Sequence, residues 1–124
     1  MKKFFICRHC GNLVEVVNNA GVPVVCCGEK MEELVPNTVE ASGEKHKPVV
    51  AVNGDVVKVA VGSIEPPMVE EHSIEWIMVE TDKGSMRKHL KPGEPPVAEF
   101  LLGGDKVIAA FAYCNLHGLW MTEV

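Results

Sequence analysis

The sequence has no excess of positive charge. Its 12 lysines and arginines face 17 aspartates and glutamates, which gives a formal net charge of −5. Binding to a nucleic acid or another polyanion needs a basic face, so we do not expect that function. A small anionic substrate is still possible, because one well-placed lysine in a cleft can dominate the local field.

The chain also lacks a long apolar run. No uninterrupted apolar segment approaches the ~18 residues of a membrane-spanning helix. The apolar start is interrupted by Cys7, Arg8 and His9 before the apolar region of a signal peptide forms. We therefore expect a soluble, cytoplasmic protein. In a reducing compartment, the 5 cysteines are expected to be metal ligands or catalytic groups before they are disulfides.

Helical periodicity is missing as well. Short runs rich in β-branched residues recur instead between turn signals, and they predict strands over residues 56–61, 74–81 and 107–113. The last run is expected to be buried on both faces. Asn53-Gly54 is a hairpin signal, and residues 82–85 form another turn. Short strands at such spacing predict an all-β fold, a sandwich or a barrel.

The cysteines divide the chain into two parts. Four of them lie in the first 27 residues, and the polar stretch 37–44 that follows is interpreted as a linker. Residues 1–36 are too few to be stable on apolar burial alone, so this module should need a metal or disulfides. Residues 37–124 are expected to form the second domain.

The first four cysteines form a predicted metal site. Cys7 and Cys10 make a C-x-x-C knuckle, and Cys26-Cys27 follows. Four thiolates are enough for a tetrahedral site. Adjacent side chains in an extended strand point in opposite directions, so both can bind one metal only if the backbone turns sharply, and Gly28 supplies that freedom. A zinc ribbon is the alternative, and the choice between iron and zinc stays open here. His9 is expected to be a solvated bystander.

A second group of candidate ligands lies further along the chain. Cys114 and His117 form a C-x-x-H pair that is able to bind one metal from a loop. The alternative is a buried cysteine beside an incidental histidine. His46 and His72 add possible nitrogen ligands. His89 lies between cations in a predicted edge strand, where a surface role is expected.

Six motifs, taken in order along the chain, resemble the desulfoferrodoxin family, a class with two domains and two irons. They span nearly the whole sequence. The motifs are Cys7-x-x-Cys10 with Cys26-Cys27, Glu44-Lys45-His46, Pro67-Met68, His72 with Ile74-Glu75-Trp76, Leu90-Lys91-Pro92-Gly93, and Tyr113-Cys114-Asn115-Leu116-His117-Gly118. The first is similar to the desulforedoxin module, and the others are similar to the superoxide reductase domain.

This resemblance implies a desulforedoxin-like module followed by a seven-stranded immunoglobulin-like sandwich. It implies reduction of superoxide to hydrogen peroxide, with a rubredoxin-like electron donor and a homodimeric assembly. Lys45 would attract the anion and help to protonate the product, and Glu44 would fill the open position of the oxidised site. The implied iron ligands are Cys7, Cys10, Cys26 and Cys27 in the first site, and His46, His72, His117 and axial Cys114 in the second.

The sequence departs from the family pattern at Pro66. The family commonly has His-Pro-Met where this chain has Pro66-Pro67-Met68, and proline offers no side-chain donor. A water, or else Glu65, Glu70 or His89, would have to replace the histidine, which leaves the second site open to partial occupancy or to zinc. Two other functions therefore compete: an electron carrier with a degenerate second site, and a zinc-bound structural module.

Overall fold

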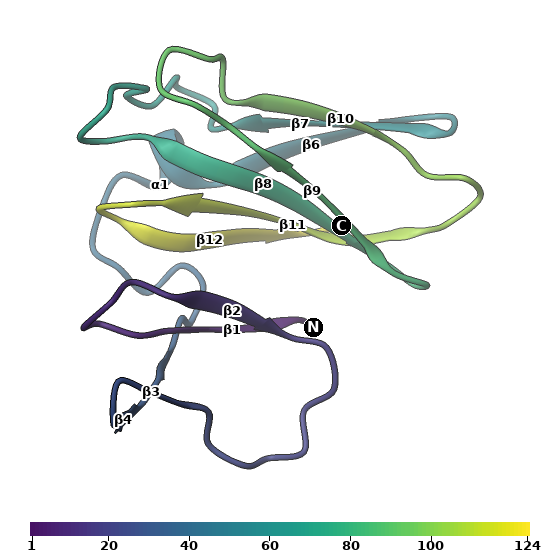
Figure 1. Cartoon of the computed structure of the whole chain (residues 1–124). Coiled ribbons are helices and arrows are strands. Elements are labelled where there is room, and N and C mark those ends of the chain that lie inside the picture. Colours follow the sequence, from purple (N-terminus) through teal and green to yellow (C-terminus); the bar gives the residue numbers. More distant parts are fainter. The chain divides into compact units, whose positions relative to one another are not determined.

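The chain folds into two compact units, Met1–Val35 and Pro36–Val124. The computed structural model describes residues 1–124 (Figure 1). Twelve strands and one helix of 4 residues make up its regular structure, which confirms the all-β prediction. None of its helices has the length and apolar character needed to span a membrane.

The first unit is built from five short strands. β1, β2 and β5 form an antiparallel sheet in the order β2-β1-β5, and β3 pairs with β4 in a separate hairpin. Its strands are β1 (Lys3–Ile6), β2 (Leu13–Val16), β3 (Val25–Cys26), β4 (Glu29–Lys30) and β5 (Glu32–Glu33). Few apolar side chains are buried here, chiefly Phe4, Ile6, Met31 and Leu34. So small a core favours a bound metal as a source of stability.

The second unit consists of two antiparallel sheets preceded by the short helix α1 (Gly43–His46) (Figure 1). One sheet has the order β10-β7-β6, and the other has the order β12-β11-β8-β9. The strands are β6 (Pro48–Asn53), β7 (Val56–Val61), β8 (Ile74–Thr81), β9 (Ser85–His89), β10 (Val97–Leu101), β11 (Val107–Cys114) and β12 (Gly118–Glu123). An immunoglobulin-like topology for these seven strands stays a prediction.

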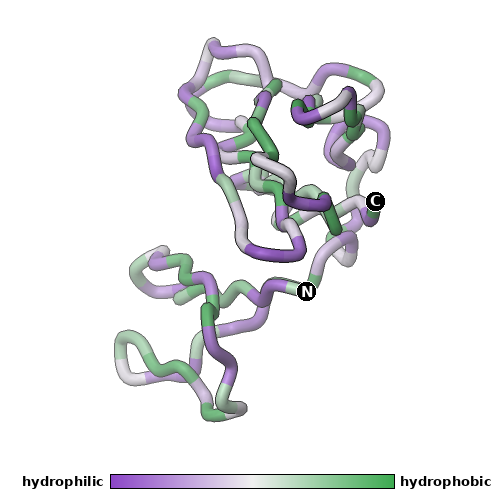
Figure 2. Tube along the Cα trace, turned by 90° about the vertical axis from the view of Figure 1, so that its right-hand side faces the viewer, coloured by the Kyte–Doolittle hydropathy of each residue, from purple (hydrophilic) through white to green (hydrophobic).

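The main hydrophobic core joins the two sheets of this unit. Alternate residues of β7 contribute Val57, Val59 and Val61, while β8 contributes Ile77 and Val79. The predicted strands 56–61 and 74–81 are confirmed, and β11 extends one residue beyond its predicted end, to Cys114. Figure 2 shows hydrophobic segments separated by hydrophilic ones along the trace. Strand periodicity is clear in the burial of β7, whereas nearly every residue of β8 and β11 is buried.

Because its strands pair antiparallel, the connections between them lie alternately at two opposite ends of the second unit. One end, which we call the His46 end, carries the segment before β6 and the connections over residues 62–73, 90–96 and 115–117. The opposite end carries the turns between β6 and β7, between β8 and β9, and between β10 and β11. Each predicted ligand of the second metal site therefore lies at the His46 end.

The stretch 37–44, interpreted as a linker, begins with a residue that is hydrogen-bonded to the second unit. The backbone N–H of Asn37 donates to the carbonyl of Leu119 at 3.0 Å. Its side-chain amide donates to the Met121 carbonyl at 3.0 Å and accepts the Met121 N–H at 2.9 Å. Asn37 has a left-handed φ of 64°, which asparagine tolerates better than most residues. A polar composition alone does not reveal such pairing with β12.

Replacing Asn37 tests whether this pairing stabilises the second unit. Asn37→Ala removes two hydrogen bonds and should lower the free energy of unfolding by about 1–2 kcal/mol. Both tryptophans, Trp76 and Trp120, lie in this unit, so the tryptophan fluorescence of a denaturant titration reports its unfolding. Glu40→Ala, which truncates an exposed side chain of the same segment, is the control. Equal midpoints for the two variants would contradict the prediction.

Candidate metal centres

A tight turn brings the two adjacent cysteines of the first unit together. Cys27 and Gly28 form the two-residue connection between β3 and β4, and their φ values are 54° and 76°. A hairpin turn of type I′ needs two such left-handed residues, and Gly28 adopts this conformation without steric cost. The turn breaks the alternation of an extended strand. The Sγ atoms of Cys26 and Cys27 consequently lie 4.0 Å apart.

The other two thiols come from the loop between β1 and β2. The N–H of Cys7 donates to the carbonyl of Asn12 at 2.8 Å, and the N–H of Gly11 donates back to the carbonyl of Cys7 at 2.8 Å. Asn12 then reaches two sulfurs: its backbone N–H lies 3.5 Å from the Sγ of Cys10, and its side-chain amide lies 3.6 Å from the Sγ of Cys26. Such N–H donors stabilise thiolates and orient them.

The four sulfurs fit a tetrahedral metal ion. All lie within 4.8 Å of one another, and those of Cys10 and Cys26 are 3.6 Å apart. Metal–sulfur bonds of about 2.3 Å would place the sulfurs of a tetrahedron roughly 3.8 Å apart. The structure therefore brings together all four cysteines of the predicted first site. His9 is exposed and is not in this group, and its Nε2 lies 3.2 Å from a carboxylate oxygen of Glu29.

The crowded thiols do not ionise alike. A hydrogen bond from the backbone N–H of Cys10 lowers the pKa of Cys7 to about 6. The hydrogen bond with the Cys10 thiol, followed by those with the other thiols, raises the pKa of Cys27 to about 12. One thiolate therefore forms easily, whereas the thiols of Cys26 and Cys27 are harder to ionise because their pKa values are raised. A bound cation would lower these pKa values, since coordination deprotonates a thiol.

In the second unit, α1 and its flanks fix the position of His46. The imidazole Nδ1 donates to the carbonyl of Ser42 at 2.6 Å, which leaves Nε2 as the lone-pair atom. The ring stacks on Trp120, with centroids 5.2 Å apart. Burial lowers the pKa of His46, which favours the neutral imidazole that binds metals. A second nitrogen fixed by a carbonyl is the usual support of a metal-binding histidine.

β11 ends at Cys114, and the connection from β11 to β12 carries His117. Cys114 is buried at the end of β11, and this burial raises the pKa of its thiol. The backbone N–H groups of Leu116 and His117 act in the opposite direction. The indole N–H of Trp120 donates to the carbonyl of His117 at 3.0 Å, which fixes the turn. A cation beside Cys114 would be needed to deprotonate so buried a thiol.

Asn115 holds the loop that carries His72. Its side-chain oxygen accepts the N–H of Ser73 at 2.9 Å, and its side-chain nitrogen donates to the carbonyl of Glu71 at 2.8 Å. The residues on either side of His72 are thereby tied to the turn that carries Cys114 and His117. Sequence reasoning gave Asn115 no role of its own, and the only available signal was its position between those two candidate ligands.

The nitrogen and sulfur atoms of this group converge. His117 Nδ1 lies 3.0 Å from His46 Nε2 and 3.2 Å from His72 Nε2, and 3.9 Å from the sulfur of Cys114. The rings of His46 and His72 are nearly parallel, at 22°, and each is steeply inclined to the ring of His117, at 83° and 75°. Metal–nitrogen bonds of about 2.0–2.1 Å at right angles give nitrogen separations of about 3 Å. The donor set therefore fits a metal ion with His46 and His72 flanking His117.

The remaining candidates lie outside both ligand groups. Glu44 and Lys45 are exposed neighbours of His46 in α1. Glu65 and Glu70 are exposed too, and neither belongs to the group around Cys114. His89 is exposed on β9, at the edge of the four-stranded sheet, as the sequence predicted.

A close approach of two backbones fixes α1 on the second unit. A Cβ atom at Gly62 would overlap the carbonyl oxygen of Glu44, so only glycine fits without movement. The same oxygen accepts the N–H of Ile64 at 2.9 Å and the hydroxyl of Ser63 at 3.4 Å. Residues 62–64 therefore hold the turn from which Lys45 and His46 project.

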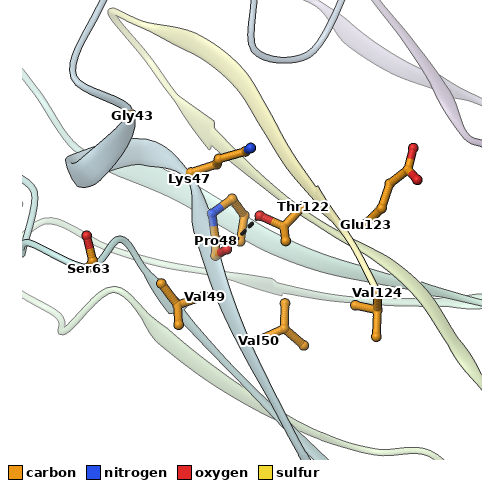
Figure 3. A pocket seen from close by; sticks show the side chains of 9 residues that line it. All are labelled: Gly43, Lys47, Pro48, Val49, Val50, Ser63, Thr122, Glu123 and Val124. Atoms are coloured by element: carbon orange, nitrogen blue, oxygen red, sulfur yellow. Dashed lines mark hydrogen bonds between the residues drawn. The ribbon is translucent and has the colours of Figure 1, made fainter.

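A hollow of about 470 Å³ elsewhere on the unit contains none of these ligands. It lies between the edge strands β6 and β12 (Figure 3). The hydroxyl of Thr122 donates there to the carbonyl of Pro48 at 2.6 Å, drawn as the dashed line in Figure 3. Lys47 and Glu123 are its only charged lining residues. With no cysteine or histidine, this hollow lacks the donors of either candidate site.

An all-β scaffold with one four-cysteine group and one histidine–cysteine group has the donor sets of a protein with two metal sites. Comparison with known proteins gives the same picture. Residues 38–123 match the family Desulfoferrodoxin, and residues 1–34 match the family Desulfoferrodoxin, N-terminal domain. The chain therefore belongs to the desulfoferrodoxin family.

Individual relatives cover almost the whole chain. It is 47% identical over 121 residues to the desulfoferrodoxin of Nitratidesulfovibrio vulgaris. The matched residues cover 98% of this chain and 95% of that protein. It is 48% identical over 116 residues to a desulfoferrodoxin homolog of Archaeoglobus fulgidus. Here the matched residues cover 94% of this chain and 92% of that protein. Its fold is similar to the crystal structure of the superoxide reductase from Treponema pallidum, with a TM-score of 0.82, 39% identity and 99% of each chain covered.

The hydrogen bonds of Asn115 predict an effect on metal binding. Asn115→Ala should release the loop of His72 and weaken metal binding at the second group by about 10–100-fold, the usual cost of removing an outer support of a ligand. The first group should retain its metal. Competition with a chelator, followed by metal analysis, measures the effect. Leu116→Ala, which truncates an exposed neighbour, is the control, and equal metal loss from both variants would refute the role of Asn115.

Proposed function

We propose that this protein is a superoxide reductase, which reduces superoxide by one electron to hydrogen peroxide. The proposal rests on the convergence of His46, His72, His117 and Cys114 within 4.8 Å. Membership of the desulfoferrodoxin family and the likeness to the Treponema pallidum superoxide reductase support it. The balanced reaction consumes one superoxide, one electron and two protons for each hydrogen peroxide.

We assign the four residues to a mononuclear iron site. When bound, ferrous iron would supply the single electron for superoxide. The three histidines would hold it as neutral imidazoles and Cys114 as a thiolate, so the protein donors would carry one negative charge. A thiolate ligand pushes electron density onto iron, as it does in haem enzymes. Burial of Cys114 keeps water from its sulfur and preserves that effect.

Lys45 and Glu44 serve the substrate side of this site. Both are exposed in α1, directly before the buried His46. The ammonium group of Lys45 attracts the superoxide anion and helps to deliver a proton to the product. The carboxylate of Glu44 would serve as an anionic donor to the oxidised site. The contact of Gly62 with the Glu44 carbonyl supports these assignments, because it fixes the backbone from which both side chains project.

The first unit is proposed to hold a second iron on Cys7, Cys10, Cys26 and Cys27. Cys10 and Cys27 are exposed, which suits electron exchange at the protein surface. The electron comes from a rubredoxin-like donor, the protein acts in the cytoplasm, and it forms a homodimer. Residues 1–36 thus form the four-cysteine iron module, and residues 37–124 form the reductase domain.

Replacing Cys114 tests the assignment of the reactive site. Cys114→Ser should abolish superoxide reduction while the first unit keeps its iron, because a serine oxygen does not match the electron donation of a thiolate. Rapid mixing of the pre-reduced protein with superoxide, together with iron analysis, measures both properties. Cys10→Ser is the control, expected to lose the other iron but to keep the reaction. If the wild-type second iron fails to react with superoxide, the electron-carrier function is favoured instead.

A charge variant tests the role of Lys45. Lys45→Ala should slow the bimolecular reaction with superoxide by roughly tenfold or more, and the remaining rate should depend less on ionic strength, because electrostatic steering is lost. Lys47→Ala removes an exposed lysine two residues further on and should have little effect. Equal rates for the two variants would show that overall charge, and not the position of Lys45, determines the rate.

A further inference from the structure

The second ligand group contains three imidazoles and no fourth nitrogen donor. The chain has 5 histidines, of which His9 belongs to the first unit and His89 lies on the edge strand β9. Only His46, His72 and His117 converge with Cys114. No aspartate or glutamate belongs to the group either.

The ring geometry locates the side on which the protein offers no donor. His46 and His72 are nearly parallel and lie on either side of His117, and their ring centroids are 6.4 Å apart. Centroid distances from His117 are shorter, 4.7 Å to His46 and 4.8 Å to His72. Three nitrogens in this arrangement would fit three adjacent corners of a square around a metal ion, with His117 in the middle. The fourth corner, opposite His117, receives no nitrogen from the chain.

Residues 62–68 follow β7 and lead towards β8, the strand that comes after His72. At the start of this segment, Ile64 is hydrogen-bonded to the carbonyl of Glu44. At its end, the Met68 sulfur accepts the N–H of Ile74 at 3.4 Å, and the Met68 carbonyl accepts the N–H of Gly93 at 2.7 Å. Pro66 is buried between these two anchors. Glu65, in the same segment, is exposed and does not belong to the ligand group.

We infer that the iron centre accepts an external nitrogen ligand of the imidazole class at the corner opposite His117. This inference rests on the proposed function, because it needs iron in the histidine–cysteine group. A neutral aromatic nitrogen base matches the three imidazoles already present in size and donor strength, and imidazole is a good ligand for iron. The position is separate from the one that superoxide uses, so the centre has two exchangeable positions.

Imidazole itself is the probe. Titration of the oxidised, iron-loaded protein should produce a saturable change in the thiolate-to-iron absorption, and difference spectra cancel the constant contribution of the four-cysteine iron. Saturating imidazole should also slow the loss of the second iron to a chelator. Neither measurement depends on superoxide.

Two variants at Pro66 assign the position of the bound imidazole. Pro66→His should supply the missing nitrogen, abolish the imidazole response and retain the second iron about tenfold longer or more, on the scale by which even outer-shell partners change metal affinity. Pro66→Ala removes the ring without adding a donor, and it should keep the imidazole response.

The outcomes separate the inference from the proposed function. Iron-loaded wild-type protein that reduces superoxide but ignores imidazole would overturn the inference alone. An equal imidazole response in wild-type and Pro66→His protein would place the ligand elsewhere and also overturn it. Wild-type protein that holds no iron on the histidine–cysteine group would overturn the proposed function and the inference together.

Discussion

The second unit is organised around four potential metal-donor atoms that it holds close together. Three imidazole nitrogens and one sulfur lie within 4.8 Å of one another. Holding them there needs separate supports. The carbonyl of Ser42 orients His46, and the amide of Asn115 ties down the loop of His72. Both supports lie at the His46 end of the sandwich, which carries the segment before β6 and the connections over residues 62–73, 90–96 and 115–117.

The two units bring donors together by different physical means. The first has a small core and relies on tight turns, in which left-handed residues such as Cys27 bend the backbone around the thiols. In such a module, metal binding contributes directly to folding. The second unit has a continuous core between two sheets, and its ligands stand on connections fixed by backbone and side-chain hydrogen bonds. Its scaffold should therefore depend much less on the metal.

Several features of the fold were predictable from local sequence. The β-branched runs at 56–61 and 74–81 gave the strand bounds correctly, because turn signals stand at their ends. The need for a sharp turn at Cys26-Cys27 followed from strand geometry, and the φ values of Cys27 and Gly28 confirm it. The C-x-x-H spacing of Cys114 and His117 placed two donors in one turn.

Other features depend on contacts between distant segments, which residue types do not reveal. The residue type of Asn37 indicates a linker, yet its side-chain amide is hydrogen-bonded to β12. The residue type of Asn115 indicates a turn, yet its side chain is hydrogen-bonded to the loop that carries His72. The close approach of Gly62 to the Glu44 carbonyl was also not predictable from the sequence. A glycine in a loop usually indicates flexibility, whereas here it is required by a tight contact.

The division of the sandwich into two ends has a practical consequence. The turns opposite the His46 end, and the C-terminus that follows β12, carry no ligand of the second group. A tether or affinity tag attached at Val124 would extend from the end of the unit remote from its ligands. The protein is therefore suited to oriented immobilisation on an electrode, with the His46 end of this unit directed towards the solution and its dissolved reactants.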